Sequence, residues 1–247
     1  MTGQWKFAAL GALGGAAIAV IIVFGSAVLG YFPASASGES IRAYMTSHPE
    51  ILAEMMNKLQ ASQDDSEDRA RQLAVDRLGL KSFFNPRVAF IAGPSNAKLT
   101  FVEFFDYNCP YCRASIPAVK KFYEAHKSNA RFAFIEFPIK GPQSVYAARA
   151  AMAARRQPEK YLAFHFLLMN EEEAVNEAIV LTDAKKAGLD VAQLQADMKD
   201  PAIDKAIDAA HNLATRARVD GTPAFIINGK MREGAVDDEL LAQMIKG

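Results

Sequence analysis

The chain has 247 residues, with 28 basic and 28 acidic side chains, so its formal net charge at pH 7 is zero. This balance gives no electrostatic reason to capture nucleic acid or an anionic membrane surface, and we expect no nucleic-acid partner. The length allows one large domain, or a medium domain with an appendage. The only cysteines are Cys109 and Cys112, and a fold of this size does not need them as a staple, so they are candidates for chemistry.

The first 37 residues have the pattern of an export segment. Lys6 precedes an apolar, uncharged run over residues 7–32. Ala34-Ser35-Ala36 would suit a signal-peptidase site, but a run of about 26 residues is long enough to span a bilayer. We therefore predict a signal peptide or membrane anchor over residues 1–37 and favour the uncleaved anchor. In both cases the remainder lies outside the cytoplasm, where disulfide chemistry has substrates.

Residues 38–82 are predicted to form a helical module. Large side chains recur in steps of four and three, the period of one helical face and of a short coiled-coil seam: Ile41, Met45, His48, Leu52, Met55 and Leu59. A capping box at Ser47-His48-Pro49-Glu50 predicts a helix from Ser47 to about Ala61, and a charged helix follows over 65–78. The stripe either packs on the following domain or mediates self-association. We favour self-association, because a helix placed before a complete domain has no obvious core to join.

Residues 83–247 are predicted to form one α/β domain. LTFVEFF at 99–105 is typical of a buried strand before a tight turn, and a helix over 114–126 with an alternating strand over 131–137 completes a β-α-β unit with parallel strands. Residues 143–219 are helical almost throughout. A strand at 224–227, an Asn228-Gly229 turn, a strand at 230–232 and a helix at 236–245 close the domain. This order describes an α/β thioredoxin-like fold with a helical domain inserted at about 143–219.

Cys109-Pro110-Tyr111-Cys112 lies where a strand gives way to a helix. The N–H groups and dipole at a helix N-terminus stabilise an anion, so Cys109 is expected to have a lowered pKa and to be the nucleophilic thiolate. Cys112, one turn further, can close on it as the resolving thiol. Exchange would then run through a mixed disulfide with a client protein. The redox-active pair itself would serve the reaction, and we expect no other cofactor.

Other uses of the cysteine pair are less favoured. Zinc normally needs four ligands, and two cysteines with four scattered histidines do not supply them, so we expect no metal site. A static disulfide between the two cysteines would close too small a loop to stabilise much. A Cu(I)-binding or chaperone module, using the two thiolates as soft ligands, stays open as a non-enzymatic alternative.

Two further positions complete the predicted site. Thr222-Pro223 lies between Gly221 and a strand, where an X-Pro bond can be cis and can turn the chain toward the cysteine pair. Glu103 is the only charge in a strand otherwise expected to be buried. A buried carboxyl group tends to have a raised pKa and could relay protons to and from Cys112. The alternative for Glu103 is a solvent-facing position on an edge strand.

The stretch FVEFFDYNCPYC, followed about 110 residues later by VDGTPAFIING, resembles the DsbA-like thioredoxin family over residues 99–247. The resemblance implies a thiol:disulfide oxidoreductase that acts on exported proteins. It implies Cys109 as nucleophile, Cys112 as resolving cysteine and Glu103 as the buried acid. The substrate-binding positions that it implies flank the cysteine pair and the cis-proline turn: Pro110, Tyr111, Thr222 and Pro223.

IRAYMTSHPEILAEMMNKLQ at 41–60 resembles the oligomerisation region of the suppressor-of-copper-sensitivity protein C subgroup, over about 39–80. Members of that subgroup are periplasmic, and the best known are trimeric disulfide isomerases. Tyr111 stands where the strongly oxidising DsbA type carries His, and Tyr supplies no positive charge to a nearby thiolate. We therefore expect a periplasmic disulfide isomerase or reductase, trimeric through its N-terminal helices and kept reduced by a membrane redox partner. The alternative is a monomeric DsbA-like dithiol oxidase.

Overall fold

The computed structural model describes residues 38–246, so the export segment predicted over 1–37, with its anchor at 7–32, lies outside the described residues. The chain forms two compact units, and the boundary between them lies between Gln63 and Asp64. Residues 64–82, which the sequence analysis grouped with the helical module, therefore belong to the second unit. Within residues 38–246, no helix is both long enough and apolar enough to cross a membrane.

The described part of the first unit consists of α2 (Gly38–Ser47) and the beginning of α3 (Pro49–Leu78). The predicted helix start at Ser47 is wrong. Ser47 ends α2, and its Oγ donates to the carbonyl oxygens of Ala43 at 3.0 Å and Tyr44 at 2.9 Å, which a helix end leaves without partners. The predicted break before residue 65 is also absent, because no glycine or proline interrupts α3 after Pro49.

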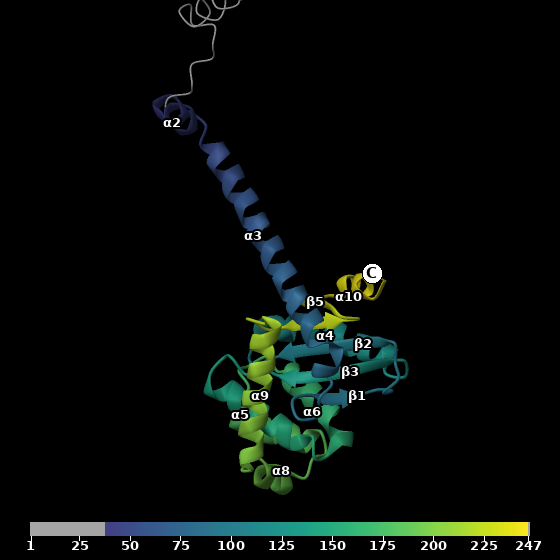
Figure 1. Cartoon of the computed structure of the whole chain (residues 1–247). Coiled ribbons are helices and arrows are strands. Elements are labelled where there is room, and N and C mark those ends of the chain that lie inside the picture. The colour runs from purple at the N-terminus through teal and green to yellow at the C-terminus, as the bar shows by residue number, and fades with distance from the viewer. Residues whose placement is uncertain (1–37, 247) are drawn as a thin grey trace, which may run out of the picture. The chain divides into compact units, whose positions relative to one another are not determined.

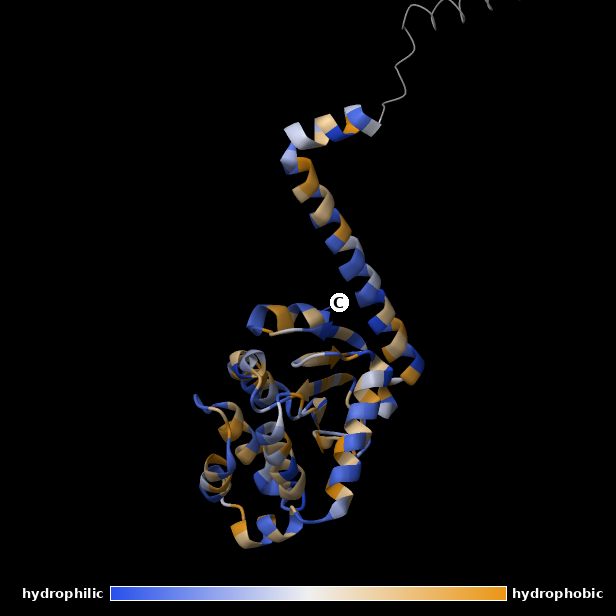
Figure 2. Ribbon diagram, turned by 90° about the vertical axis from the view of Figure 1, so that its left-hand side faces the viewer, coloured by the Kyte–Doolittle hydropathy of each residue, from blue (hydrophilic) through white to orange (hydrophobic). Residues whose placement is uncertain are grey.

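Large apolar side chains are exposed on the first unit. Their exposed fractions run from 50% to 62%, and they recur along α2 and α3: Ile41, Tyr44, Leu52, Met55, Met56 and Leu59. Figure 2 shows hydrophobic and hydrophilic residues interleaved along these helices. None of the residues of α2 is buried. Four of the six residues of the predicted apolar stripe are therefore exposed, namely Ile41, Leu52, Met55 and Leu59, whereas Met45 and His48 are partly buried.

The second unit is built on a five-stranded sheet with the order β1-β3-β2-β4-β5 (Figure 1). The strands are β1 (Phe90–Ala92), β2 (Leu99–Phe105), β3 (Ala130–Glu136), β4 (Ala224–Ile227) and β5 (Lys230–Glu233). The parallel pairing of β2 with β3 confirms the predicted β-α-β unit, and β4 and β5 form the predicted hairpin. The edge strand β1 was not predicted, because three residues are too few to show a period.

Helices connect and cover this sheet. Helix α4 (Pro110–His126) joins β2 to β3, and α10 (Asp238–Lys246) closes the chain after β5. The inserted helices are α5 (Pro142–Ala154), α6 (Pro158–Met169), α7 (Glu177–Lys186), α8 (Val191–Asp197) and α9 (Pro201–Ala217). Several of them begin at a proline, whose missing N–H and fixed φ suit the first helical turn.

Alternating side chains of the sheet enter two hydrophobic cores. Phe101 and Phe225 face the core formed with α4, α10 and inserted helices. Val102 and Ile226 face the opposite core, which α9 covers together with Val75 from the C-terminal part of α3. The end of α3 is therefore part of the second unit rather than a free extension of it.

Phe101 is fully buried on the central strand, and its ring lies 5.4 to 6.2 Å from four other aromatic rings. Phe101→Ala would leave a cavity among rings that cannot collapse freely, so we expect a loss of about 3 to 5 kcal/mol in the free energy of unfolding. Urea denaturation of the reduced chain measures it. The control is Leu73→Ala, since Leu73 is 54% exposed; it should stay within about 0.5 kcal/mol. Equal effects of the two substitutions would contradict this description of the core.

Candidate active site

The two cysteines meet at the start of α4. Cys109 is the N-cap residue with an extended backbone, Pro110 occupies the first helical turn, and Cys112 lies in that same turn. Both cysteines are buried free thiols. The Sγ of Cys109 lies 3.1 Å from the carbonyl oxygen of Thr222, to which it donates a hydrogen bond when the thiol is protonated. Residues more than one hundred positions apart in the sequence thus share one site.

The surroundings separate the acidities of the two thiols. A hydrogen bond from the Cys112 thiol, together with the backbone N–H groups of Tyr111 and Cys112, lowers the pKa of Cys109 to about 5, although burial opposes the shift. Burial and the hydrogen bond to Cys109 raise the pKa of Cys112 far above its usual range. One sulfur is therefore an anion at neutral pH, and the other keeps its proton. Such a pair can attack a disulfide with the first sulfur and hold the second in reserve.

The turn before Cys109 is fastened by Asp106. Its buried carboxylate accepts hydrogen bonds at Oδ1 from the Asn108 N–H and the Ser144 hydroxyl, both at 2.7 Å. At Oδ2 it accepts from the N–H groups of Ile139 at 2.7 Å and Lys140 at 2.8 Å. The carboxyl end of β2 is thereby tied to the loop that leads from β3 into α5.

A second set of bonds ties the turn to the inserted helices. Asn108 pairs with both backbone groups of Val175: its Oδ1 accepts from the N–H at 2.7 Å, and its Nδ2 donates to the carbonyl at 3.2 Å. The Arg113 guanidinium donates to the carbonyl oxygens of Tyr107 at 3.0 Å and Glu172 at 3.3 Å. It also reaches Oδ1 of Asn108 at 3.2 Å. Two sides of the reactive turn are therefore held by parts of the chain that the sequence analysis did not associate with it.

The cis bond predicted at Thr222-Pro223 is confirmed. Thr222 is almost fully buried, and the carbonyl of Pro223 accepts from the Gly234 N–H at 2.9 Å. The remaining predicted positions, Pro110 and Tyr111, lie at the exposed start of α4, where 66% of the Tyr111 surface is accessible. The structure thus brings the two predicted substrate-binding segments to the same sulfur atom.

Glu103 lies inside the sheet. It pairs with Phe134 on β3 and Phe225 on β4, so it occupies a central strand and the edge-strand alternative is wrong. The side chain is fully buried, and neither carboxyl oxygen has a hydrogen-bond partner among the described residues. Burial alone raises the pKa of Glu103 to about 8. Its charge also contributes to the raised pKa of Cys112.

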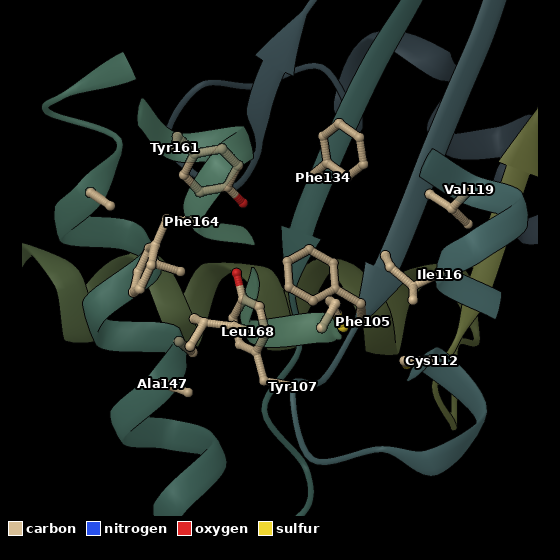
Figure 3. Packing of buried hydrophobic residues seen from close by; sticks show 14 of the residues in the cluster. Phe105, Tyr107, Cys112, Ile116, Val119, Phe134, Ala147, Tyr161, Phe164 and Leu168 are labelled. Atoms are coloured by element: carbon tan, nitrogen blue, oxygen red, sulfur yellow. The ribbon is translucent and has the colours of Figure 1, made fainter. Parts of the chain in front are cut away.

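A buried polar cluster lies between the sheet and the insertion. Figure 3 shows the hydroxyl groups of Tyr107 and Tyr161 directed toward one another. The Tyr107 hydroxyl also lies 3.2 Å from Nδ1 of His165, and the Tyr161 hydroxyl donates to Glu136 at 2.7 Å. Burial lowers the pKa of His165 to about 3, so its ring is neutral at physiological pH. Glu136 forms an ion pair with Arg155, so the cluster joins the reactive turn to α5 and α6.

Five residues that fasten the turn were missed by sequence reasoning: Asp106, Asn108, Arg113, Ser144 and Val175. A polar residue at the carboxyl end of a buried parallel strand was the one available signal, and it indicated Asp106 only as part of a turn. For metals, we find no group of three or more His, Cys, Asp or Glu side chains placed to hold an ion within residues 38–246.

We expect the thiolate absorbance of the reduced chain to titrate with a midpoint near pH 5, from Cys109 alone. Ultraviolet absorbance at 240 nm measures it, with Cys109→Ser as the control that removes the transition. The pKa of Cys109 in the folded state lies below the ordinary thiol value of 9.0. The thiolate therefore stabilises the folded state fully above pH 9.0, and this stabilisation is lost as the pH falls through about 5. A midpoint near 9 would contradict the geometry described above.

Solved structures of thioredoxin-like proteins resemble this chain. A thioredoxin-like oxidoreductase from Silicibacter pomeroyi is 40% identical, with 68% of this chain and 96% of that one covered and a TM-score of 0.62. A periplasmic thioredoxin-like protein from Salmonella enterica serovar Typhimurium is 32% identical, with 67% and 92% covered and a TM-score of 0.61. Proteus mirabilis ScsC in a transitional conformation is 28% identical, with 83% and 92% covered and a TM-score of 0.63.

The sequence comparisons find relatives of two kinds and one family model. The Na(+)/H(+) antiporter NhaA 3 of Salinispora tropica is 29% identical over 157 residues, which are 63% of this chain but only 24% of the antiporter. This chain therefore spans about a quarter of the length of that relative. The probable disulfide bond formation protein D of Bacillus cereus is 27% identical, with 60% of this chain and 77% of that protein covered. The family model described as Thioredoxin matches residues 86–247. The chain belongs to the thioredoxin family, and its structural neighbours include thiol-disulfide oxidoreductases of the DsbA and ScsC type.

Proposed function

We propose that this protein rearranges or reduces disulfides in exported proteins, with Cys109 as nucleophile and Cys112 as resolving thiol. The observation that carries the proposal is the separation of the two thiol acidities at the start of α4. At neutral pH Cys109 is a thiolate and Cys112 keeps its proton, which are the protonation states that the first step of disulfide exchange requires.

The exchange begins when the Cys109 thiolate attacks a client disulfide. A mixed disulfide forms, and one client sulfur leaves as a thiolate. In isomerisation another client thiolate attacks the mixed disulfide and returns Cys109 as a thiolate, so no net electrons move. In reduction Cys112 gives its proton to a base and attacks Cys109 Sγ, so that the bond from Cys109 to the client breaks, the client sulfur leaves as a thiolate, and a Cys109–Cys112 disulfide remains. A membrane redox partner must then supply two electrons to restore the dithiol.

Glu103 is proposed as the proton acceptor for Cys112 in the resolving step. Its carboxyl oxygens lack hydrogen-bond partners among the described residues, and its pKa of about 8 lets it exchange a proton near neutral pH. The physical link between them is the effect of the Glu103 charge on the pKa of Cys112. Only the ionised form of Glu103 can accept this proton, and the transfer leaves Glu103 neutral, which avoids the cost of a buried, unpaired carboxylate.

Client binding is proposed at the two segments beside Cys109. The backbone of Thr222-Pro223 lies against the reactive sulfur, and Pro110 and Tyr111 are exposed at the start of α4. A client cysteine joined to Cys109 must place its neighbouring residues on these surfaces, because the mixed disulfide fixes its position. An unfolded client segment can contact both surfaces more readily than a rigid one.

Self-association through residues 38–63 supports isomerisation. The exposed apolar side chains of α2 and the beginning of α3 would be covered by second and third copies of the same helices. We propose a trimer in the periplasm, in which several Cys109 sites face one client while its disulfides are rearranged. Anchoring by residues 7–32 remains part of this proposal.

A dithiol oxidase is the second candidate, and the acidity of Cys109 favours it. The pKa of about 5 means that the Cys109 thiolate, and with it the reduced form, is stabilised at neutral pH, and this makes the disulfide a better oxidant. Tyr111 argues the other way, because it brings no positive charge to the thiolate. The balance between these effects decides in which direction electrons flow.

Residues 38–247 should form a trimer, and Leu52→Glu with Leu59→Glu should reduce it to a monomer, because the charges would face the apolar helices of the partners. Multi-angle light scattering measures the mass. Leu73→Glu, at an exposed position of the second unit, is the control. Reactivation of a client with scrambled disulfides should fall at least about tenfold in the double variant, since the sites lose their shared client. A native monomer that oxidises reduced clients would favour the oxidase.

Glu103→Gln should slow release of the client from the mixed disulfide by about tenfold or more, because Cys112 loses its proton acceptor. Stopped-flow measurement of Cys109–Cys112 closure checks this, and the first attack by Cys109 should be unchanged. The raised pKa of Glu103 stabilises the fold below the ordinary value of 4.5, and this contribution is lost as pH rises through about 8. The variant should therefore be more stable than the native chain above pH 8. An unchanged closure rate would remove Glu103 from the reaction.

A further inference from the structure

Helix α3 holds the β4–β5 hairpin through two consecutive side chains. Gln72 donates from Nε2 to the carbonyl of Gly229 at 2.8 Å and accepts at Oε1 from the N–H of Met231 at 3.0 Å. Its amide therefore pairs with the outer edge of β5, as a neighbouring strand would. Val75, one turn further, is buried in the core beneath the same sheet face. These contacts all lie within the second unit.

Arg71 reaches the end of the same hairpin. Its Nε lies 3.4 Å from Oε2 of Glu233, and its other nitrogens lie 3.2 Å from Glu67 and Asp68. Only 16% of the Arg71 side chain and 23% of the Glu233 side chain are exposed, so water screens this pair less than a surface pair. Arg71 thus forms an ion pair with one oxygen of Glu233, without a hydrogen bond from its Nε, and the other oxygen can accept a hydrogen bond.

The second oxygen of Glu233 holds the loop that carries the cis-proline. Oε1 accepts from the Asp220 N–H at 3.0 Å. Glu233 is also the ladder partner of Ala224, and the next residue, Gly234, donates to the Pro223 carbonyl at 2.9 Å. The end of β5 therefore holds the loop on both sides of Thr222, whose carbonyl oxygen lies 3.1 Å from Cys109 Sγ.

We propose that Glu233 is a positioning residue for disulfide exchange, which holds residues 220–223 in place beside Cys109, and that Arg71 orients it. The inference rests on the proposed function, because the loop position matters only if Cys109 exchanges with a client whose backbone meets Thr222-Pro223. Without the bond from Asp220 the loop has more conformations, and a polypeptide must order it on binding. A disulfide without a peptide backbone does not use the loop and should not detect the change.

Substitutions at Glu233 separate its two bonds. In the full chain, Glu233→Ala should raise KM for a disulfide-containing peptide about fivefold, as expected for one lost hydrogen bond. Glu233→Gln keeps an acceptor for Asp220 but loses the charge that Arg71 attracts, so KM should rise about threefold, less than in Glu233→Ala. The exchanged pair Arg71→Glu with Glu233→Arg restores the attraction but gives residue 233 no acceptor, so KM should stay raised. Arg71→Met, which leaves Glu233 intact, should raise KM about threefold.

Hydroxyethyl disulfide provides the second readout, since it has no peptide backbone. Its rate with Cys109 should change less than about twofold in every variant, because the sulfur and the start of α4 are intact. Arg156→Met is the matched control: it removes ion pairs with Asp197 and Asp200 in the insertion and should leave the peptide KM unchanged. Thermal unfolding of each variant shows whether a loss of fold accounts for any change.

Each contrary result has a distinct meaning. Restoration of the peptide KM by the exchanged pair would show that only the ion pair matters, and it would overturn the role of the Asp220 bond. An unchanged KM in Glu233→Ala and Arg71→Met would overturn the proposal altogether. If the native chain exchanged with neither the peptide nor hydroxyethyl disulfide, the proposed function itself would fail, and this inference with it.

Discussion

The hydrogen bond from Cys112 to Cys109, at the N-terminus of α4, is the interaction on which the rest of the site depends. A buried sulfur can carry negative charge only where donors replace the water that it has lost. The helix start supplies N–H groups, and the Cys112 thiol supplies a further hydrogen bond. Hydrogen bonds hold the turn that carries these donors in place. Asp106 bonds to the loop after β3, and Asn108 and Arg113 bond to the insertion.

The cost of burying a charge also explains the surroundings of the two buried glutamates, Glu103 and Glu136. Glu103 lies on the central strand without a hydrogen-bond partner among the described residues, which is tolerable because its raised pKa keeps it largely neutral below about 8. Glu136 has a different solution, since Arg155 and the Tyr161 hydroxyl share its charge. The first carboxyl group is thus available for proton exchange, and the second joins the sheet to the inserted helices.

Much of the fold could be predicted because its strands have strong local patterns. The bounds of β2 and β4 agree with the expected ones, since each is a run of apolar and β-branched residues that ends at turn-forming residues. The errors have local causes as well. Ser47 can satisfy the end of one helix as well as begin the next, and β1 is too short to show alternation. The end of α3 was assigned to a separate module, because Val75 packs against residues that are far from it in the sequence and nothing in the local pattern indicates this contact.

The sequence by itself determined the reactive pair, the strand and helix on either side of it, and the turn at Thr222-Pro223, because these depend on residues close together in the chain. Only the tertiary structure decided which distant groups control them. Val175 holds the turn before Cys109, and Glu233 links Arg71 to the loop beside the same sulfur. Such contacts join residues separated by tens to more than one hundred positions, and their side chains carry no local pattern. They exist only because the sheet order brings β2 next to β4 and places the insertion against the reactive turn.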